Sequence, residues 1–186
     1  MPAETTSALF LGPAQPYFGA VSAETTLGFT EGGLSVRLTD ERADLKYDRG
    51  GTNPADSTQI GRMIEISMSL AEIDHDNITL SLPGSTKIVD GMDASRTKVN
   101  VPVGVGNQMT RDGFAKSLLI KPLIAGIVTT DEQFFVRFGA AAPRIDTELS
   151  YSRENQQLLA LTFFAYPDDS DADLFLAIFG DENAEV

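Results

Sequence analysis

The strongest constraint on the fold is the alternation of apolar and polar residues along several short segments. Leu34, Val36 and Leu38 alternate with polar residues, and the same two-residue period runs through 60–70. Successive side chains of a β-strand point to opposite faces of the sheet, so this period is typical of strands with one buried face. It predicts a mostly β (α+β) domain, built as a sandwich or barrel of two packed antiparallel sheets with one short flanking helix and extended arms and loops.

The strands expected from this pattern are short and are distributed along the chain. We expect 34–39 and 43–47 to pair as two antiparallel strands across the acidic break at 40–42. Further strands are expected at 60–70, 86–90, 98–103, 117–122, 133–138, 146–151, 158–166 and 174–179, with a turn at 152–156. No internal repeat, linker or change of composition divides 1–186, so we expect a single domain.

One short stretch changes to a helical pattern. Asp74 is a good helix N-cap, and Ile73 and Ile78 have the spacing of a hydrophobic staple. Ile78 and Leu82 then share a face, and Pro83 with the following glycine ends the element. The sequence therefore predicts one helix of about two turns.

Two segments are rich in residues that form turns. Residues 1–23 contain several Pro and Gly residues and are expected to form an extended N-terminal arm. The second segment is expected to be a long exposed loop able to contact another molecule. It consists of Asp48, Arg49, Gly50, Gly51, Thr52, Asn53, Pro54, Ala55, Asp56 and Ser57.

Composition argues against several classes of function. The chain has no Cys, which removes disulfides and thiolate chemistry, and its net charge of −13 disfavours a nucleic-acid reader. His75 is the only histidine and is expected on the helix surface, and the acidic run 168–173 lacks the Gly and Glu of a calcium loop. We therefore expect no catalytic residue, no cofactor and no metal site, and hence no enzyme.

The N-terminus carries no positively charged segment before an apolar one, so no signal peptide is expected. The longest apolar stretch, 117–128, is interrupted by Lys121 and Pro122 and is shorter than the ~20 residues that span a bilayer. We expect no membrane partner.

Several stretches together resemble the tail tube (major tail) protein family of long-tailed bacteriophages. They are 27–36, 43–48, 51–56, 70–73 with the Leu-Pro-Gly stop at 82–84, 149–152, 161–168 and 179–181. The resemblance spans about 150 residues and depends on the order and spacing of the pieces. Residues 85–133 match nothing in this pattern.

The resemblance implies a structural virion protein, assembled in the host cytoplasm and located in the phage tail. Six copies form a ring, and the rings stack through a long loop and the terminal arms into a hollow tube. In this chain 48–57 occupies the place of the stacking loop. Other tail proteins would bind the tube ends, and DNA would pass through the lumen without specific binding. An acidic bore would repel phosphate, since six copies carry roughly −78 before screening by salt.

Two alternatives stay open. A head–tail connector or tail terminator of related fold would form one ring and no polymer. A monomeric β-sandwich that binds a ligand or carbohydrate belongs to another class, and the absence of Trp counts against it.

Overall fold

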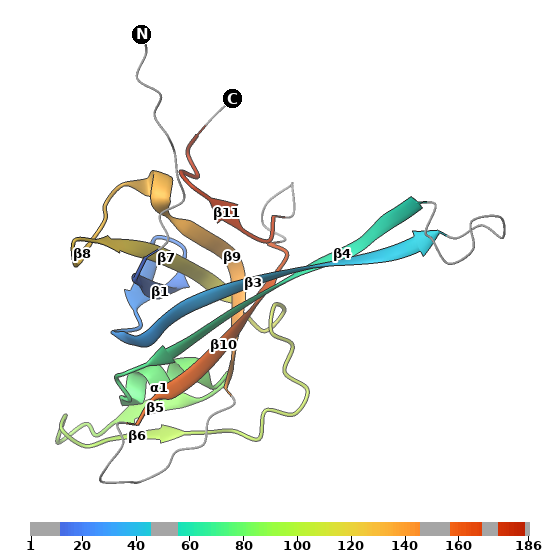
Figure 1. Ribbon diagram of the computed structural model, residues 1–186. Coiled ribbons are helices and arrows are strands. Elements are labelled where there is room, and N and C mark those ends of the chain that lie inside the picture. Colours follow the sequence, from blue (N-terminus) through green and yellow to red (C-terminus); the bar gives the residue numbers. More distant parts are fainter. Residues whose placement is uncertain (1–11, 46–55, 146–156, 169–174, 185–186) are drawn as a thin grey trace.

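The computed structural model describes residues 12–45, 56–145, 157–168 and 175–184. The chain is mostly β, with a large antiparallel sheet, a small second sheet and one short helix (Figure 1). The strands are β1 (Ala14–Ala20), β2 (Ala23–Thr26), β3 (Thr30–Leu45), β4 (Asp56–Leu70), β5 (Thr86–Val89), β6 (Thr97–Asn100), β7 (Lys116–Ile124), β8 (Ile127–Val128), β9 (Val136–Ile145), β10 (Leu159–Tyr166) and β11 (Ile178–Phe179). The helix is α1 (His75–Ser81), and a 3-10 turn covers Glu132–Phe134.

The large sheet curls so that its two edge strands approach each other. Its order is β2-β1-β7-β9-β10-β4-β3, with β8 and β11 added on β7 and β9. The edge strands β2 and β3 are consecutive in the chain, and the three residues 27–29 that join them can span at most about 15 Å. Phe18 of β1 and Phe163 of β10, which are not on neighbouring strands, have ring centroids 5.1 Å apart. The expectation of a mostly β, barrel-like fold is therefore confirmed.

The core lies inside this curl and is lined by alternate residues of the strands. Its buried members are Phe18, Leu27, Ile64, Ile66, Met68, Leu70, Leu118, Ile120, Phe138, Ala141, Leu159, Leu161 and Phe163. The row at 64–70 follows the predicted two-residue period, because every second residue of β4 points inward there.

Helix α1 begins where the sequence predicts. The Asp74 side chain accepts a hydrogen bond from the Asn77 backbone N–H at 2.6 Å, which caps the first turn. The buried positions of the helix are the polar residues Asn77 and Ser81, whereas Ile78 is only half-buried. Asn77 Nδ2 donates to the carbonyl oxygens of Leu27 at 3.3 Å and Glu72 at 3.0 Å, so this buried amide fastens the helix to the edge of the sheet.

The small sheet packs against the other side of α1. Lys87 of β5 forms an ion pair with Asp76 at 2.7 Å, and Thr97 Oγ1 of β6 lies 2.9 Å from His75 Nδ1 in a hydrogen bond. The weak strands expected at 86–90 and 98–103 are thus found at Thr86–Val89 and Thr97–Asn100, paired with each other.

Two strand predictions are wrong. Residues 34–39 and 43–45 do not form a hairpin, because Thr30–Leu45 is one continuous strand that pairs with β4, with register shifts after Thr30 and after Glu41. Residues 46 and 47 lie outside the described residues. Residues 133–135 are not a strand either. The Asp131 side chain accepts from the Gln133 backbone N–H at 3.1 Å and caps a 3-10 turn, and β9 begins only at Val136.

The N-terminal prediction is corrected in part. Residues 14–20 and 23–26 form β1 and β2 and belong to the large sheet, so 1–23 is not an arm without regular structure. Phe18 is 3% exposed. Residues 1–11 lie outside the described residues, as do 146–156, where the sequence predicts a strand and a turn. Of the final predicted strand, 174–179, the described part 175–179 is regular only at Ile178–Phe179.

The ring contact across the curled sheet gives a stability prediction. We expect Phe163→Ala to lower the free energy of unfolding by about 3–5 kcal/mol, because it removes a fully buried aromatic side chain and leaves a cavity. Phe29 is 70% exposed, so the same truncation there should cost about 0.5 kcal/mol or less. Urea unfolding of the two variants measures both values, and equal losses would contradict the curled core.

Candidate functional site: a projecting hairpin

The β3–β4 hairpin extends well beyond the body of the molecule (Figure 1). Pairing between β10 and β4 stops at Glu65, so residues 56–64 of β4 pair with β3 alone. The paired strands run on from Leu38 and Ile64 to Leu45 and Asp56, a length of about 25 Å at the rise of a β-strand.

The projecting part carries apolar side chains that nothing in the described chain covers. Leu38 is 53% exposed, Leu45 48%, Ile60 67% and Met63 44%. A two-stranded hairpin alone is marginally stable in water, and an exposed strand edge is a template for pairing with another chain. The hairpin therefore has the properties of a surface that contacts a partner.

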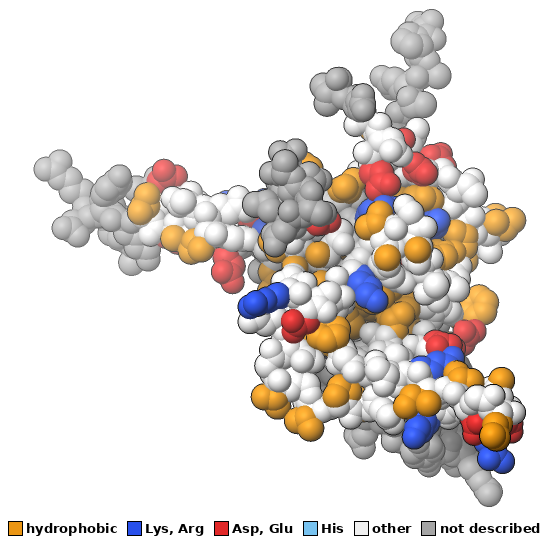
Figure 2. Space-filling view, turned by 180° about the vertical axis from the view of Figure 1, so that it is seen from behind, with side chains coloured by type: hydrophobic (Ala, Val, Ile, Leu, Met, Phe, Trp, Pro, Cys, Tyr) orange, Lys and Arg blue, Asp and Glu red, His pale blue; other side chains and the backbone are white. Residues whose placement is uncertain are grey.

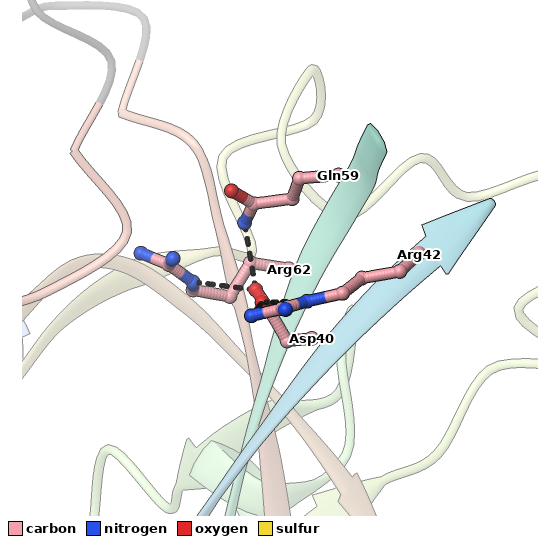
Figure 3. Close-up of polar contacts among 4 residues, drawn as sticks. All are labelled: Asp40, Arg42, Gln59 and Arg62. Carbon is pink, nitrogen blue, oxygen red and sulfur yellow. Dashed lines mark hydrogen bonds and ion pairs between the residues drawn. The ribbon is translucent and has the colours of Figure 1, made fainter. Parts of the chain in front are cut away.

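A polar cluster holds the two strands of the hairpin together outside the core (Figure 3). Arg42 donates from Nε and Nη2 to Asp40 Oδ2 at 3.1 and 3.0 Å. Gln59 Nε2 and Arg62 Nε donate from β4 to Asp40 Oδ1 at 2.6 and 3.2 Å. These hydrogen bonds, first from Arg42 and then from Arg62, lower the pKa of Asp40 below its usual value.

The Asp40 cluster lies on one face of the hairpin only. Asp40 pairs in register with Arg62, and Leu38 pairs with Ile64, so the cluster continues the row of residues that forms the core nearer the body. A bulge follows, where the register shifts between Glu41 and Arg42. A β-bulge of this kind increases the local twist of the hairpin and is common in edge strands.

The predicted contact loop belongs to this hairpin. Asp56 and Ser57 are in β4, opposite Leu45 and Asp44 of β3. The rest of the predicted set, 48–55, lies outside the described residues. Asp56 and Ser57 are therefore strand residues and not loop residues, and the sequence also failed to predict how far the two strands extend.

A second cluster of charges fixes the C-terminal segment to the sheet. Arg137 of β9 pairs with Glu182 at 3.0 Å and with Glu24 at 3.9 Å, and Ser117 donates to Glu24 at 2.9 Å. The side chains of Arg137 and Glu24 are 17% and 7% exposed, so they are largely withdrawn from water and partnered. Lys121 lies beside them, 4.9 Å from the ring centroids of Tyr17 and Phe135. We regard this cluster as structural.

Other chemistry is scarce among the described residues. No group of three or more His, Asp or Glu side chains in the described ranges is placed to hold a metal ion. His75 lies exposed in the first turn of α1, as the sequence predicts. Of the acidic run 168–173, all but Asp168 lies outside the described part. No helix in the described chain is long and apolar enough to cross a bilayer.

Comparison of the chain with protein-family models finds no match, and comparison with curated proteins finds none either.

Removal of the central carboxylate should loosen the hairpin alone. In Asp40→Asn we expect faster amide hydrogen exchange at 38–45 and 57–63, because two guanidinium partners lose their shared anion. Exchange in the buried part of β4 should stay the same. Asp44→Asn removes an exposed acid from the same strand and serves as the control. An equal effect of both variants would contradict the role of the cluster.

The lowered pKa of Asp40 predicts a pH dependence with a definite sign. The contribution of the ionised carboxylate is complete above the usual carboxyl pKa of 3.8 and disappears as the pH falls through the lowered value. We therefore expect the NMR shifts of the Arg42 and Arg62 side-chain N–H groups to hold at pH 4 and to change only at lower pH. A midpoint at or above 3.8 would show that the hydrogen bonds are not maintained in solution.

Proposed function

We propose that the chain is a structural virion protein, the tail tube (major tail) protein of a long-tailed bacteriophage. In this proposal six copies form a ring, rings stack into a hollow tube, and DNA leaves through the lumen. The observation that carries the proposal is the β3–β4 hairpin, which extends apolar side chains and strand edges away from a closed body. A single copy gains little from such an element, whereas a copy within an assembly buries it.

The charge of the chain supports the same proposal. A net charge of −13 favours solubility of the free subunit and disfavours binding to phosphate. A conduit for DNA needs a wall that the polymer does not adhere to. In this proposal DNA passes through the lumen without specific binding. Other tail proteins bind the tube ends, and the protein is located in the virion tail.

A ligand-binding module is the alternative from another class. A cavity of about 900 Å³ opens between β2, α1 and residues 112–114, and its rim includes Glu72, Asp74 and Asp112. Its size is within the range of small-molecule sites. A monomer with saturable binding in this cavity would favour the alternative.

The hairpin gives a direct test of stacking. Leu45 and Asp56 are opposite each other, so residues 46–55 can be replaced by Asn-Gly to give a two-residue turn between intact strands. We expect this variant to fold normally but to lose the largest species in sedimentation velocity, because it lacks the segment assigned to ring stacking. Rings should persist.

The matched control is Ile127→Ser, which alters an exposed apolar residue of the short strand β8. It should assemble as the unmodified chain does. If the shortened hairpin supports the same large species as the unmodified chain, the stacking role predicted for the loop 48–57 is wrong. If neither the shortened variant nor the unmodified chain associates at any concentration, the proposed function itself is contradicted.

A further inference from the structure

Exposed apolar side chains are concentrated in two places on the described chain. Ten of its sixteen exposed large hydrophobic residues fall in the projecting hairpin or in 88–105. The second group is Ile88, Val89, Met92, Val101, Val103 and Val105, with exposed fractions from 41% to 101%. Figure 2 shows apolar side chains mixed with charged ones at the end of the molecule that carries β5 and β6. Exposure on this scale is typical of a binding surface.

The β5–β6 hairpin contains a shallow groove that combines apolar and cationic side chains. The groove has a volume of about 490 Å³, and its lining includes Ile88, Asp90, Arg96 and Lys98. Arg96 pairs with Asp93 at 3.3 Å, so Lys98 is the cation that the argument depends on. Ile88 and Lys98 are cross-strand partners, so they lie side by side on one face of the small sheet. The opposite face carries Lys87 and Thr97, which contact α1. The Ile88–Lys98 face is therefore turned away from the body.

This groove lies in a segment of positive net charge within an acidic chain. Residues 86–116 contain five Lys or Arg and three Asp, a net charge of +2 within a total of −13. An acidic partner is therefore attracted here and repelled from most of the remaining surface.

The projecting hairpin has the complementary character. On the face opposite the Asp40 cluster, β3 presents Glu41, Ala43 and Leu45, and Met63 of β4 is the partner of Thr39 on this face. Glu41, Leu45 and Met63 are all exposed. This outer face joins an acid to apolar side chains, and the groove offers the exposed cation Lys98 beside the apolar Ile88.

We propose that the outer face of the hairpin of one copy docks on the β5–β6 groove of a second copy, with Glu41 opposite Lys98. This inference rests on the proposed function, and it identifies the surface of a second copy on which the β3–β4 hairpin docks. The two surfaces lie at separate ends of one molecule, so a copy cannot satisfy its own groove (Figure 1). A contact between two different patches of the same chain is heterologous, and repetition of it generates rings or filaments.

The lengths of the two surfaces agree. The exposed part of β3 spans eight residues, about 25 Å. The stretch from β6 through Val101, Val103 and Val105 spans nine residues, at most about 30 Å. The three valines are exposed beyond the end of β6.

Charge reversal tests the pairing. We expect Glu41→Lys and Lys98→Glu each to weaken self-association by about tenfold or more, since each places like charges together. The double variant carries both reversals and should recover most of the association measured by sedimentation velocity. Glu31→Lys combined with Lys98→Glu is the matched control and should not recover. A Glu41→Lys/Lys98→Glu variant as impaired as the single variants would overturn the pairing.

Cross-linking separates this contact from the proposed function. The chain has no Cys, so a mixture of Ala43→Cys and Ile88→Cys copies joins through a short bis-maleimide only where the two surfaces meet. We expect a covalent heterodimer from this mixture and little from Ala43→Cys with Val21→Cys, which marks an exposed apolar residue elsewhere. Rings or tubes without this cross-link would overturn the contact and leave the proposed function standing. The cross-link in dimers that form no ring would support the contact and contradict the tube.

Discussion

The connection from β2 to β3 is the constraint on which the rest of the structure depends. Three residues join the two edge strands of the large sheet, so the sheet must curl. Leu27 donates its backbone N–H to Pro16 at 3.0 Å, and Ala71 donates to Phe29 at 2.9 Å. Gly28 between them has φ of +86°, and a Cβ there would lie 2.6 Å from the Glu72 carboxylate. The positive φ favours glycine at this position, whereas the exposed Glu72 side chain can move aside.

The same closure explains why the hairpin projects. The strands that enclose the small core can be short, and the pairing of β10 with β4 ends at Glu65. The remaining residues of β3 and β4 have no third strand to pair with, so they leave the body as a two-stranded ribbon. Beyond the apolar core, the Asp40 carboxylate of β3 links the two strands by accepting hydrogen bonds from Gln59 and Arg62 of β4. The result is a closed body with one extended element that leaves apolar side chains exposed.

The sequence predicted the parts in which pattern and burial coincide. Residues 64–70 alternate because one face is buried, and Asp74 caps the helix by local geometry. Prediction from the sequence failed where tertiary contacts override the local structural preference of the residues. Pro16 suggested an arm, yet it lies in β1 opposite Ile120 of β7, and its carbonyl oxygen accepts from the Leu27 backbone N–H. The polar triplet 40–42 suggested a turn, but a projecting ribbon tolerates polar residues on both faces. Nothing local in the sequence indicates that β3 continues past the body.

Electron microscopy of the purified chain at high concentration tests the central claim most directly. The account predicts hollow tubes, or rings with six-fold symmetry in averaged images, because the hairpin and its receptor are on different patches of one chain. Particles of one copy at every concentration, or closed two-fold dimers, would contradict it.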